Sequence, residues 1–531
     1  MTPFKNFMII VSFMLVSYAQ SMTISGVVKD KQTSLLVSGA KVTLLKGGIS
    51  DITDSAGKFS LSRNTSPSNL SDTLIITNDK YWKKKVPVTL LNTSNFEIKL
   101  QAKKQRLVIT TDIGGGDPDD LQSMVHAILL SNEFDLEGII YGHAWGNSSL
   151  DRLGRGKQRI ESAIDAYEKV LPNLKVHAEG YPDPEYLRSI VKQGQLNARM
   201  TGTGEGKDSD GSNLIIDVVD KKGDPRPVWL NAWGGANTIA QAYWKVKKTR
   251  SPEQVEKFVH KVRVYDILGQ CDGGSWIAKN FPDAFYIRNA HKGVYGWAPS
   301  KSWTAENVQS HGPLGTIYPS AKWAIEGDSP SFFHISSRGL NDPDEIDQGG
   351  WGGRFGPEKK TGVPLFHWAE RQAEVNASDK SLRPYFIFTN TSEGIYAINK
   401  WQGDIHNSLA VRMDWTIKSK REEANHFPVA VLNGDSTRQI LEMAVDPGEQ
   451  IILDASGSSD PDGDHLKYTW LFYNEASSYD GGVAIHGSDS PIAKVTVPSD
   501  ALGKNIHIIL VIHDNGPPHL HAYRRMILNV N

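Results

Sequence analysis

Residues 106–123 read RLVITTDIGGGDPDDLQS, in which an apolar stretch is followed by three glycines and then by an aspartate-rich segment. The apolar residues at 107–111 predict a buried strand, and those at 121–129 recur at the spacing of an amphipathic helix. A strand that is followed by a glycine turn and the first turn of a helix is the repeating element of an α/β domain. In the sheets of such domains, polar sites lie at the carboxyl ends of the strands.

Four aspartates lie within this short segment, namely Asp112, Asp117, Asp119 and Asp120. Two like charges a few ångströms apart repel by about 1–4 kcal/mol, depending on the local dielectric. The positive end of a helix dipole offsets only about 0.3–1 kcal/mol for each carboxylate. The set therefore indicates a hard cation, and Ca²⁺ accepts carboxylate ligands in an all-protein cage more readily than Mg²⁺ does. The alternative is a capped turn with solvated carboxylates.

The composition is that of an ordinary globular protein, with 531 residues, 39% hydrophobic, 22% charged and a formal net charge of −2. This length exceeds one hydrophobic core and predicts about three domains. The balanced charge gives no reason to expect a nucleic acid polymer or a membrane surface as partner. The single cysteine, Cys271, excludes an internal disulfide, and we expect a buried neutral thiol there rather than a nucleophile.

Residues 1–19 have the pattern of a cleaved secretory signal. Lys5 precedes the apolar run at 7–16, and Ser-Tyr-Ala at 17–19 fits a small-x-small cleavage site. The run is too short to span a bilayer. We therefore expect a secreted or periplasmic bacterial protein without a membrane span, the alternative being a buried N-terminal strand.

Two β-rich segments flank the middle of the chain. At 20–102, short alternating strands with Gly, Asn and Asp turns predict a β-sandwich, and ISGVVKD, SGAKVTLL and ITDSAGKFSL resemble the carboxypeptidase regulatory-like domains. At 425–531, DPGEQIILDASGSSDPDGDHLKYTW resembles the polycystic-kidney-disease-type immunoglobulin-like modules. Asp460, Asp462 and Asp464 in that stretch form either a structural Ca²⁺ site or a solvated acidic turn.

Residues 105–417 alternate strands and helices. Strands are expected at 107–111, 136–141, 228–231 and 262–267, with a helix at 237–247. This alternation predicts a mostly parallel sheet with helices on both faces, lying between the two β-sandwich domains.

The middle domain contains the motifs TTDIGGGDPDD, LEGIIYGHAWGN, WLNAWGGANTIAQA, YDILGQCDGGSWIAKNFPDAFYI, SHGPLGTIYP and EGDSPSFF. Together they resemble the nucleoside hydrolase-like domain of the Sde182-type cellulose-binding proteins, from about residue 105 to residue 426. The resemblance implies an α/β nucleoside hydrolase-like fold and a Ca²⁺ site at which glycosidic bonds are cleaved.

The resemblance also implies roles for single residues. Asp112 would bind Ca²⁺ and act as the general base, and Asp120 and Asp328 would supply further carboxylates. Asn237 would lend a backbone carbonyl to the metal. The residues that would contact the sugar are Asp119 and Asn147.

The sequence departs from the nucleoside hydrolase pattern near this site. The turn before Asp119 is about three residues longer, so Asp117 is extra, and Gly327 stands where a histidine often protonates a leaving base. A general acid is therefore missing. His311 is our first candidate for it and His143 the second, each against the alternative of a structural histidine.

Other polar and aromatic residues flank the same loops. Asp272 and Gln270 follow an expected strand and are candidates to face the substrate. The aromatic residues are interpreted either as platforms for sugar rings or as loop packing. They are Trp145, Trp233, Trp276, Trp351 and Tyr141.

Two functions follow from these observations. The first is a secreted Ca²⁺-dependent hydrolase of an O- or N-glycosidic bond, with a carbohydrate or glycoside as substrate. The second is a non-catalytic polysaccharide-binding protein that retains the hydrolase scaffold. A plain scaffold protein would not account for the aspartate set. The sugar, the anomer and the oligomeric state stay open.

Overall fold

A computed structural model describes most of the chain, and it separates into two compact units, one ending at Lys103 and the other beginning at Lys104. The expected signal at 1–19 lies outside the described residues, as do Trp145 and Asn147. Among the described residues, no helix combines the length and the apolar character needed to cross a membrane. The described ranges are 20–30, 36–45, 48–65, 71–78, 81–89, 94–100, 104–143, 149–289, 292–322, 325–336, 338–356 and 394–531.

The first unit is a β-sandwich, as the alternating pattern predicts. One sheet has the order β4-β1-β7 and the other the order β3-β2-β5-β6. In β7 every second side chain is buried, and the buried residues of both sheets form one core. The strands are β1 (Gln20–Asp30), β2 (Lys41–Leu44), β3 (Ser50–Ile52), β4 (Lys58–Thr65), β5 (Ser71–Asn78), β6 (Tyr81–Thr89) and β7 (Phe96–Leu100).

The second unit is built on a six-stranded sheet with the order β10-β9-β8-β11-β12-β13, in which every pair of neighbours is parallel. The predicted parallel sheet is therefore confirmed. The chain order reverses between β8 and β11, and ligands bind at such a switch point in open α/β sheets. The strands are β8 (Gln105–Thr111), β9 (Phe134–Tyr141), β10 (Val191–Gln193), β11 (Val228–Ala232), β12 (Val262–Ile267) and β13 (Phe285–Asn289).

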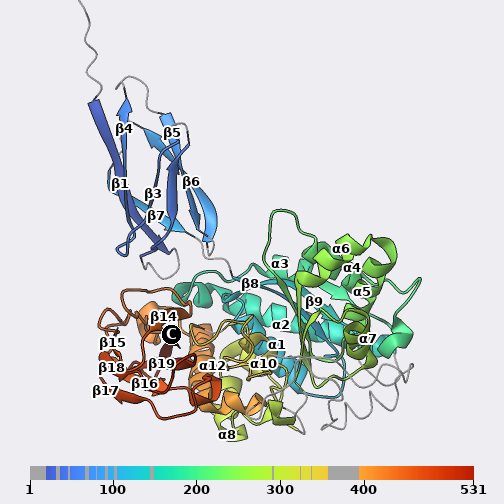
Figure 1. Ribbon diagram of the computed structural model, residues 1–531. Coiled ribbons are helices and arrows are strands. Elements are labelled where there is room, and N and C mark those ends of the chain that lie inside the picture. Colours follow the sequence, from blue (N-terminus) through green and yellow to red (C-terminus); the bar gives the residue numbers. More distant parts are fainter. Residues whose placement is uncertain are drawn as a thin grey trace, which may run out of the picture. The chain divides into compact units, whose positions relative to one another are not determined.

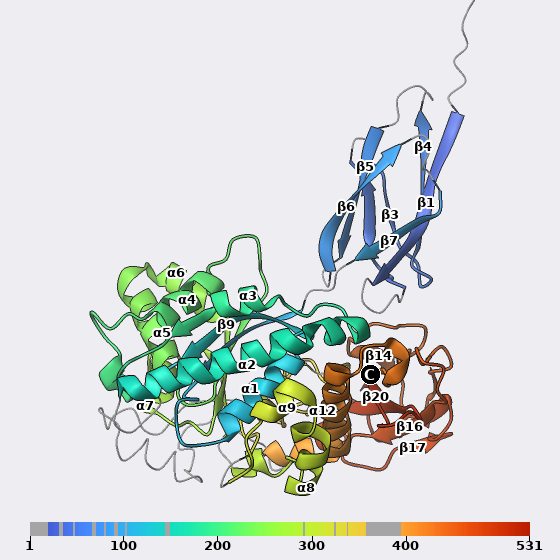
Figure 2. The same cartoon turned by 180° about the vertical axis from the view of Figure 1, so that it is seen from behind.

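Helices cover both faces of this sheet (Figures 1 and 2). Residues of α1, α2, α9, α10 and α12 share one core with one face, and residues of α4 to α7 share a second core with the other. The helices are α1 (Asp119–Leu129), α2 (Leu150–His177), α3 (Pro184–Ser189), α4 (Asp210–Val219), α5 (Asn237–Thr249), α6 (Pro252–His260), α7 (Asp272–Asn280), α8 (Lys301–Thr304), α9 (Gly312–Ile317), α10 (Ser329–Phe333) and α12 (Gln402–Ile417).

A second β-sandwich ends the chain and belongs to the same compact unit as the parallel sheet. Its two sheets have the orders β14-β20-β19-β16 and β15-β18-β17. Asp404 of α12 accepts hydrogen bonds from His513 and Tyr523 of this sandwich, so polar contacts join it to the helical layer. The strands are β14 (Leu441–Val445), β15 (Gln450–Asp454), β16 (Lys467–Phe472), β17 (Ala484–His486), β18 (Ile492–Thr496), β19 (Asn505–His513) and β20 (His521–Val530).

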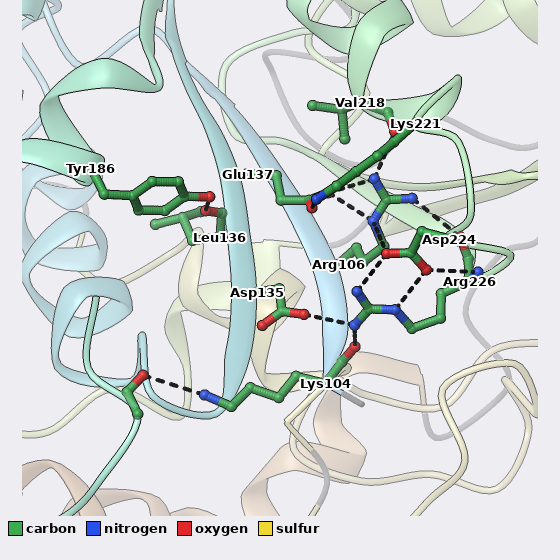
Figure 3. Close-up of polar contacts among 11 residues, drawn as sticks. Lys104, Arg106, Asp135, Leu136, Glu137, Tyr186, Val218, Lys221, Asp224 and Arg226 are labelled. Carbon is green, nitrogen blue, oxygen red and sulfur yellow. Dashed lines mark hydrogen bonds and ion pairs between the residues drawn. The ribbon is translucent and has the colours of Figure 1, made fainter. Parts of the chain in front are cut away.

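A buried ion network holds the amino edge of the sheet, at the end of β8 opposite the aspartate turn (Figure 3). Arg106 of β8 is fully buried and pairs with Glu137 of β9 at 2.7 Å and with Asp224 at 3.4 Å. Arg226 pairs with Asp224 at 2.6 Å and with Asp135 at 2.7 Å. These charges are mutually satisfied, which gives this edge a structural role and leaves the carboxyl edge as the place for a site.

Candidate metal centre

Asp112 directly follows β8, at the carboxyl edge of the sheet. Its backbone carbonyl accepts a hydrogen bond from the Gly115 N–H at 2.8 Å, which closes the glycine turn. A Cβ atom at Gly234, just after β11, would lie 2.3 Å from Oδ1 of Asp112. The carboxylate therefore lies between the ends of β8 and β11, at the switch point of the sheet.

Asp119 and Asp120 are the first two residues of α1. They are 7% and 5% exposed, and Oδ1 of Asp119 accepts a hydrogen bond from the backbone N–H of Asp120 at 3.1 Å. The hydroxyl of Thr111, at the end of β8, donates a hydrogen bond to Oδ1 of Asp120. Because both carboxylates are buried, the alternative of a turn with solvated carboxylates does not describe them.

Asp328 reaches the same place from a distant part of the chain. It precedes α10 and is 2% exposed. Asp119, Asp120 and Asp328 each offer a carboxylate oxygen within 4.8 Å of the other two, which defines what we call the aspartate triad. This cluster of hard oxygen donors fits a divalent cation such as Ca²⁺.

The electrostatics of Asp112 and Asp119 reflect burial and crowding. Burial raises the pKa of Asp112 to about 6, although the nearby Arg152 guanidinium acts in the opposite direction. Burial, and then the charges of Asp117 and Asp112, raise the pKa of Asp119 to about 7. Both carboxylates are thus more costly to ionise than free aspartates.

The same causes act on the other two triad members. Burial, followed by the charges of Asp112 and Asp119, raises the pKa of Asp120 well above its ordinary value. Burial, followed by the charges of Asp120 and Asp119, does the same for Asp328. A bound cation would relieve this repulsion, so the donor set and its electrostatics both fit a metal ion.

Arginines of α2 hold the glycine turn. Nη1 of Arg159 donates to the carbonyls of Ile113 and Gly115. A Cβ atom at Gly114 would lie 2.0 Å from the carbonyl oxygen of Arg152, so glycine is required for this approach. The sequence analysis missed this clamp, for which the signal is Arg152, Arg155 and Arg159 at helical spacing on α2.

Asn237 and His143 lie at the same edge as Asp112, and all three line one small cavity. Nδ2 of Asn237 donates to the carbonyls of His143 at 2.7 Å and of Asn197 at 3.0 Å. Nε2 of His143 lies 3.1 Å from the carbonyl oxygen of Ser149, and burial lowers the His143 pKa. The structure thus brings Asn237 near Asp112, while its role as a metal ligand stays a prediction.

His311 lies away from the aspartates. Its Nε2 is 3.0 Å from Oδ1 of Asp414 in α12. Its neighbour Gly312 lies against Thr416, whose carbonyl binds Asn173 near the end of α2. Arg152, which lies beside Asp112, precedes Asn173 by about 20 residues on the same helix. At 1.5 Å per residue, the two ends of α2 that contact Asp112 and the His311 region are therefore roughly 30 Å apart. This position does not favour His311 as the general acid.

The tryptophans near the glycine loops are packed in the core. Trp233 is 1% exposed and donates its indole N–H to Ser331 at 2.9 Å. Trp351 is also 1% exposed, and its indole donates to the Tyr523 hydroxyl at 3.3 Å. A ring without an exposed face offers no platform to a sugar, so loop packing describes both residues. Trp276 is half-buried against Phe281.

The side chains of Asp272 and Gln270 form hydrogen bonds with the backbone of neighbouring loops. The carboxylate of Asp272, which begins α7, accepts the Met200 N–H at 2.8 Å, and the residue is 1% exposed. Gln270 donates to the carbonyl of Trp233. Cys271 between them is 1% exposed, and burial raises its pKa to about 12, which confirms the expected neutral thiol. Substrate contacts by Asp272 and Gln270 stay predictions.

Tyr295 lies beside Gly327 and is not among the residues that the sequence analysis singled out. It ends a short 3₁₀ turn, Lys292–Tyr295, and its side chain is half-buried. A Cβ atom at Gly327 would lie 2.2 Å from Cε1 of Tyr295. The tyrosine ring therefore occupies the space of any side chain at position 327, and no local sequence pattern signals this contact.

The fold and this site define the class of the α/β part of the second unit, which is a nucleoside hydrolase-like domain. The model of the cellulose-binding Sde182 nucleoside hydrolase-like domain matches residues 106–355, and that of the Sde0182 C-terminal domain matches residues 450–530. The solved structure of a nucleoside hydrolase-related hypothetical protein from Saccharophagus degradans, described as associated with carbohydrate metabolism, is 48% identical. The match covers 81% of this chain and 100% of that chain, with a TM-score of 0.75.

The chain therefore belongs to the Sde182 family of cellulose-binding proteins with a nucleoside hydrolase-like domain. A solved PKD domain of the KIAA 1837 protein is 22% identical over 17% of this chain and 79% of its own, but its TM-score of 0.14 supports no conclusion. The comparison with curated proteins found no match.

Proposed function

We propose that this protein is a secreted Ca²⁺-dependent hydrolase of glycosidic bonds in carbohydrate metabolism. The observation that carries the proposal is the aspartate triad, in which three buried carboxylates from two distant segments converge at the switch point of a parallel sheet. Such a cluster costs stability unless a cation balances it. The description of the Saccharophagus degradans relative as associated with carbohydrate metabolism supports the substrate class.

The residues fall into roles at this centre. Asp120 and Asp328 would hold Ca²⁺ with Asp112 and with the backbone carbonyl of Asn237. When bound, Ca²⁺ would orient two sugar hydroxyls and make a water molecule more acidic. Asp112 would accept a proton from the attacking water, and its half-buried carboxylate, 13% exposed, lies where solvent can enter. Asp119, the third member of the aspartate triad, would lie beside the ion and receive hydrogen bonds from the sugar hydroxyls.

Secretion belongs to the proposal because of residues 1–19, whose charge, apolar run and small residues fit a cleaved signal. A cellulose-like polysaccharide outside the cytoplasm is then a natural source of substrate, in line with the name of the family.

The second candidate is a non-catalytic polysaccharide-binding protein that retains the same scaffold. The observation in its favour is Gly327, which leaves the site without the histidine expected in a nucleoside hydrolase. A Ca²⁺ ion could then hold a diol without cleavage of the adjacent bond.

Two measurements separate these functions. Ca²⁺ should raise the melting temperature of the wild type, and Asp120→Asn should abolish this rise. If Ca²⁺ left the melting temperature of the wild type unchanged, the proposal of a metal centre would be wrong. Product analysis on nucleosides, 4-nitrophenyl glycosides and cello-oligosaccharides then tests catalysis. No turnover by the wild type, together with cello-oligosaccharide binding retained in Asp112→Ala, would favour the binding protein.

A further inference from the structure

The contact between Tyr295 and Gly327 shapes one wall of the aspartate site. Besides Cε1 at 2.2 Å, the Cδ1 and Cζ atoms of Tyr295 would lie 2.8 and 3.2 Å from a Cβ atom at position 327. The edge of the ring that carries the hydroxyl therefore lies against the backbone next to Asp328. A glycine is needed here because any larger residue would displace the ring.

The contact with Gly327 places the phenol of Tyr295 beside the backbone that leads into Asp328. Asp119, Asp328, Asp117 and Asp120 all act on this phenol electrostatically. Tyr295 is half-buried, so part of its side chain reaches the surface. A phenol beside a carboxylate site offers a hydrogen-bond donor, whereas aspartates that are ionised around a bound cation can only accept.

The other donors of the site lie elsewhere. Nη2 of Arg152 is 3.9 Å from Asp112, on the side of the site that faces α2. His143 holds the backbone of Ser149, and His311 pairs with Asp414. Among the described residues named here, the hydrogen-bond donor that lies next to Gly327 is the hydroxyl of Tyr295.

A hydrogen-bond donor at the position of the Tyr295 hydroxyl would distinguish O-glycosides from nucleosides, because their glycosidic bonds differ in the atom that leaves. In an O-glycoside the leaving atom is an ether oxygen with lone pairs that accept a hydrogen bond. In a nucleoside the glycosidic nitrogen shares its lone pair with the base and is a poor acceptor.

We propose that Tyr295 contacts the substrate, with its hydroxyl donating a hydrogen bond to the bridging oxygen, and that the site is therefore built for O-glycosides rather than for nucleosides. This inference rests on the proposed function and narrows its substrate class.

The test compares Tyr295→Phe with the wild type. Tyr186→Phe is the matched control, since the Tyr186 hydroxyl donates to the carbonyl of Leu136 at the amino edge of the sheet (Figure 3). Three readouts are needed: the Ca²⁺-induced rise in melting temperature, kcat/KM on 4-nitrophenyl β-D-glucopyranoside, cellobiose and inosine, and calorimetric binding of cellobiose with Ca²⁺.

The wild type should prefer the O-glycosides to inosine. Tyr295→Phe should keep the full Ca²⁺ response but lose about tenfold in kcat/KM on O-glycosides, the effect of one hydrogen bond of about 1.4 kcal/mol. Gly327→Ala, which displaces the ring, should cause a similar loss. Equal O-glycoside kinetics in Tyr295→Phe, a wild-type preference for inosine, or a lost Ca²⁺ response would overturn the inference.

Failure of the proposed function gives a different pattern. If the wild type cleaves none of the three compounds, the hydrolase proposal fails, and cellobiose binding decides the inference. Weaker binding by Tyr295→Phe than by the wild type would then support a substrate contact. Equal binding by both proteins, or none by the wild type, would overturn it.

Discussion

Gly234 and Asp112 lie in direct contact at the carboxyl edge of the sheet, with no room for a side chain between them. A Cβ atom at position 234 would lie 2.3, 2.6 and 2.8 Å from Oδ1, Cγ and Cβ of Asp112. This contact joins the ends of β11 and β8, the two strands between which the chain order reverses. The position of the Asp112 carboxylate is thus set by a glycine more than a hundred residues later in the chain.

Gly234→Ala should displace Asp112 and reduce the Ca²⁺-induced rise in melting temperature by half or more, because the new methyl group overlaps the carboxylate. Calcium titration followed by thermal unfolding measures this. Gly154→Ala is the control, since Gly154 is an exposed helical glycine in α2 with open space around it and should gain up to about 1 kcal/mol. A normal Ca²⁺ response in Gly234→Ala would contradict this placement of the metal.

Asp328→Asn should have opposite effects with and without the metal. Without Ca²⁺ at pH 8, the loss of one charge from the aspartate triad should stabilise the fold by roughly 1 kcal/mol or more, since less repulsion remains. With Ca²⁺, the variant should show no rise in melting temperature. Asp217→Asn, at an exposed position of α4, should change neither value. If Asp328→Asn behaved like Asp217→Asn, the triad would not be a metal centre.

Glu133→Gln should destabilise the helical layer of the α/β domain, where Glu133 is the counter-ion of buried arginines. The Glu133 carboxylate, 8% exposed, binds Arg338, Arg412 and Arg438 at 2.6 to 2.8 Å. Although burial acts in the other direction, Arg338, Arg438 and Arg412 hold the pKa of Glu133 well below its ordinary value.

Removal of this charge leaves two buried guanidinium groups, those of Arg338 and Arg412, without their counter-ion. We expect a loss of about 3–5 kcal/mol in the free energy of unfolding, measured by urea denaturation. Arg438→Ala should cost at most about 1 kcal/mol, because Arg438 is 51% exposed. Equal losses in the two variants would argue against a buried role for Glu133.

His334 should make the fold sensitive to acid. Burial lowers its pKa to about 4, whereas an unfolded histidine titrates near about 6.5. The stability from the neutral ring is therefore fully present above about pH 6.5 and is lost as the pH falls toward 4, because only the unfolded chain binds the proton there.

The free energy of unfolding should fall by up to about 3 kcal/mol over this range through His334 alone. His334→Gln should remove that share of the slope in urea denaturation at pH 4.5 and pH 7. His486→Gln, at an exposed position of β17, should keep the wild-type slope. An unchanged slope in His334→Gln would exclude this group as the source.

Much of the fold follows from local pattern. The alternation of strands and helices predicts the parallel sheet, and the turn after β8 places Asp112, Asp119 and Asp120 at its carboxyl edge, because strand and helix periods are properties of neighbouring residues. Burial was less predictable. The glycines next to Trp233 in the sequence are compatible with an exposed ring that stacks on a sugar. In the structure, however, the Trp233 ring packs against Phe332 with ring centroids 5.9 Å apart.

What the sequence by itself determined is the local half of the centre, where the glycine turn and the start of α1 bring Asp112, Asp119 and Asp120 together within nine positions. The tertiary structure alone decided the other half. It places Asp328 among these carboxylates and sets the ring of Tyr295 against Gly327. Contacts between segments so far apart in the chain depend on how the helices pack over the sheet, and no local periodicity carries that information.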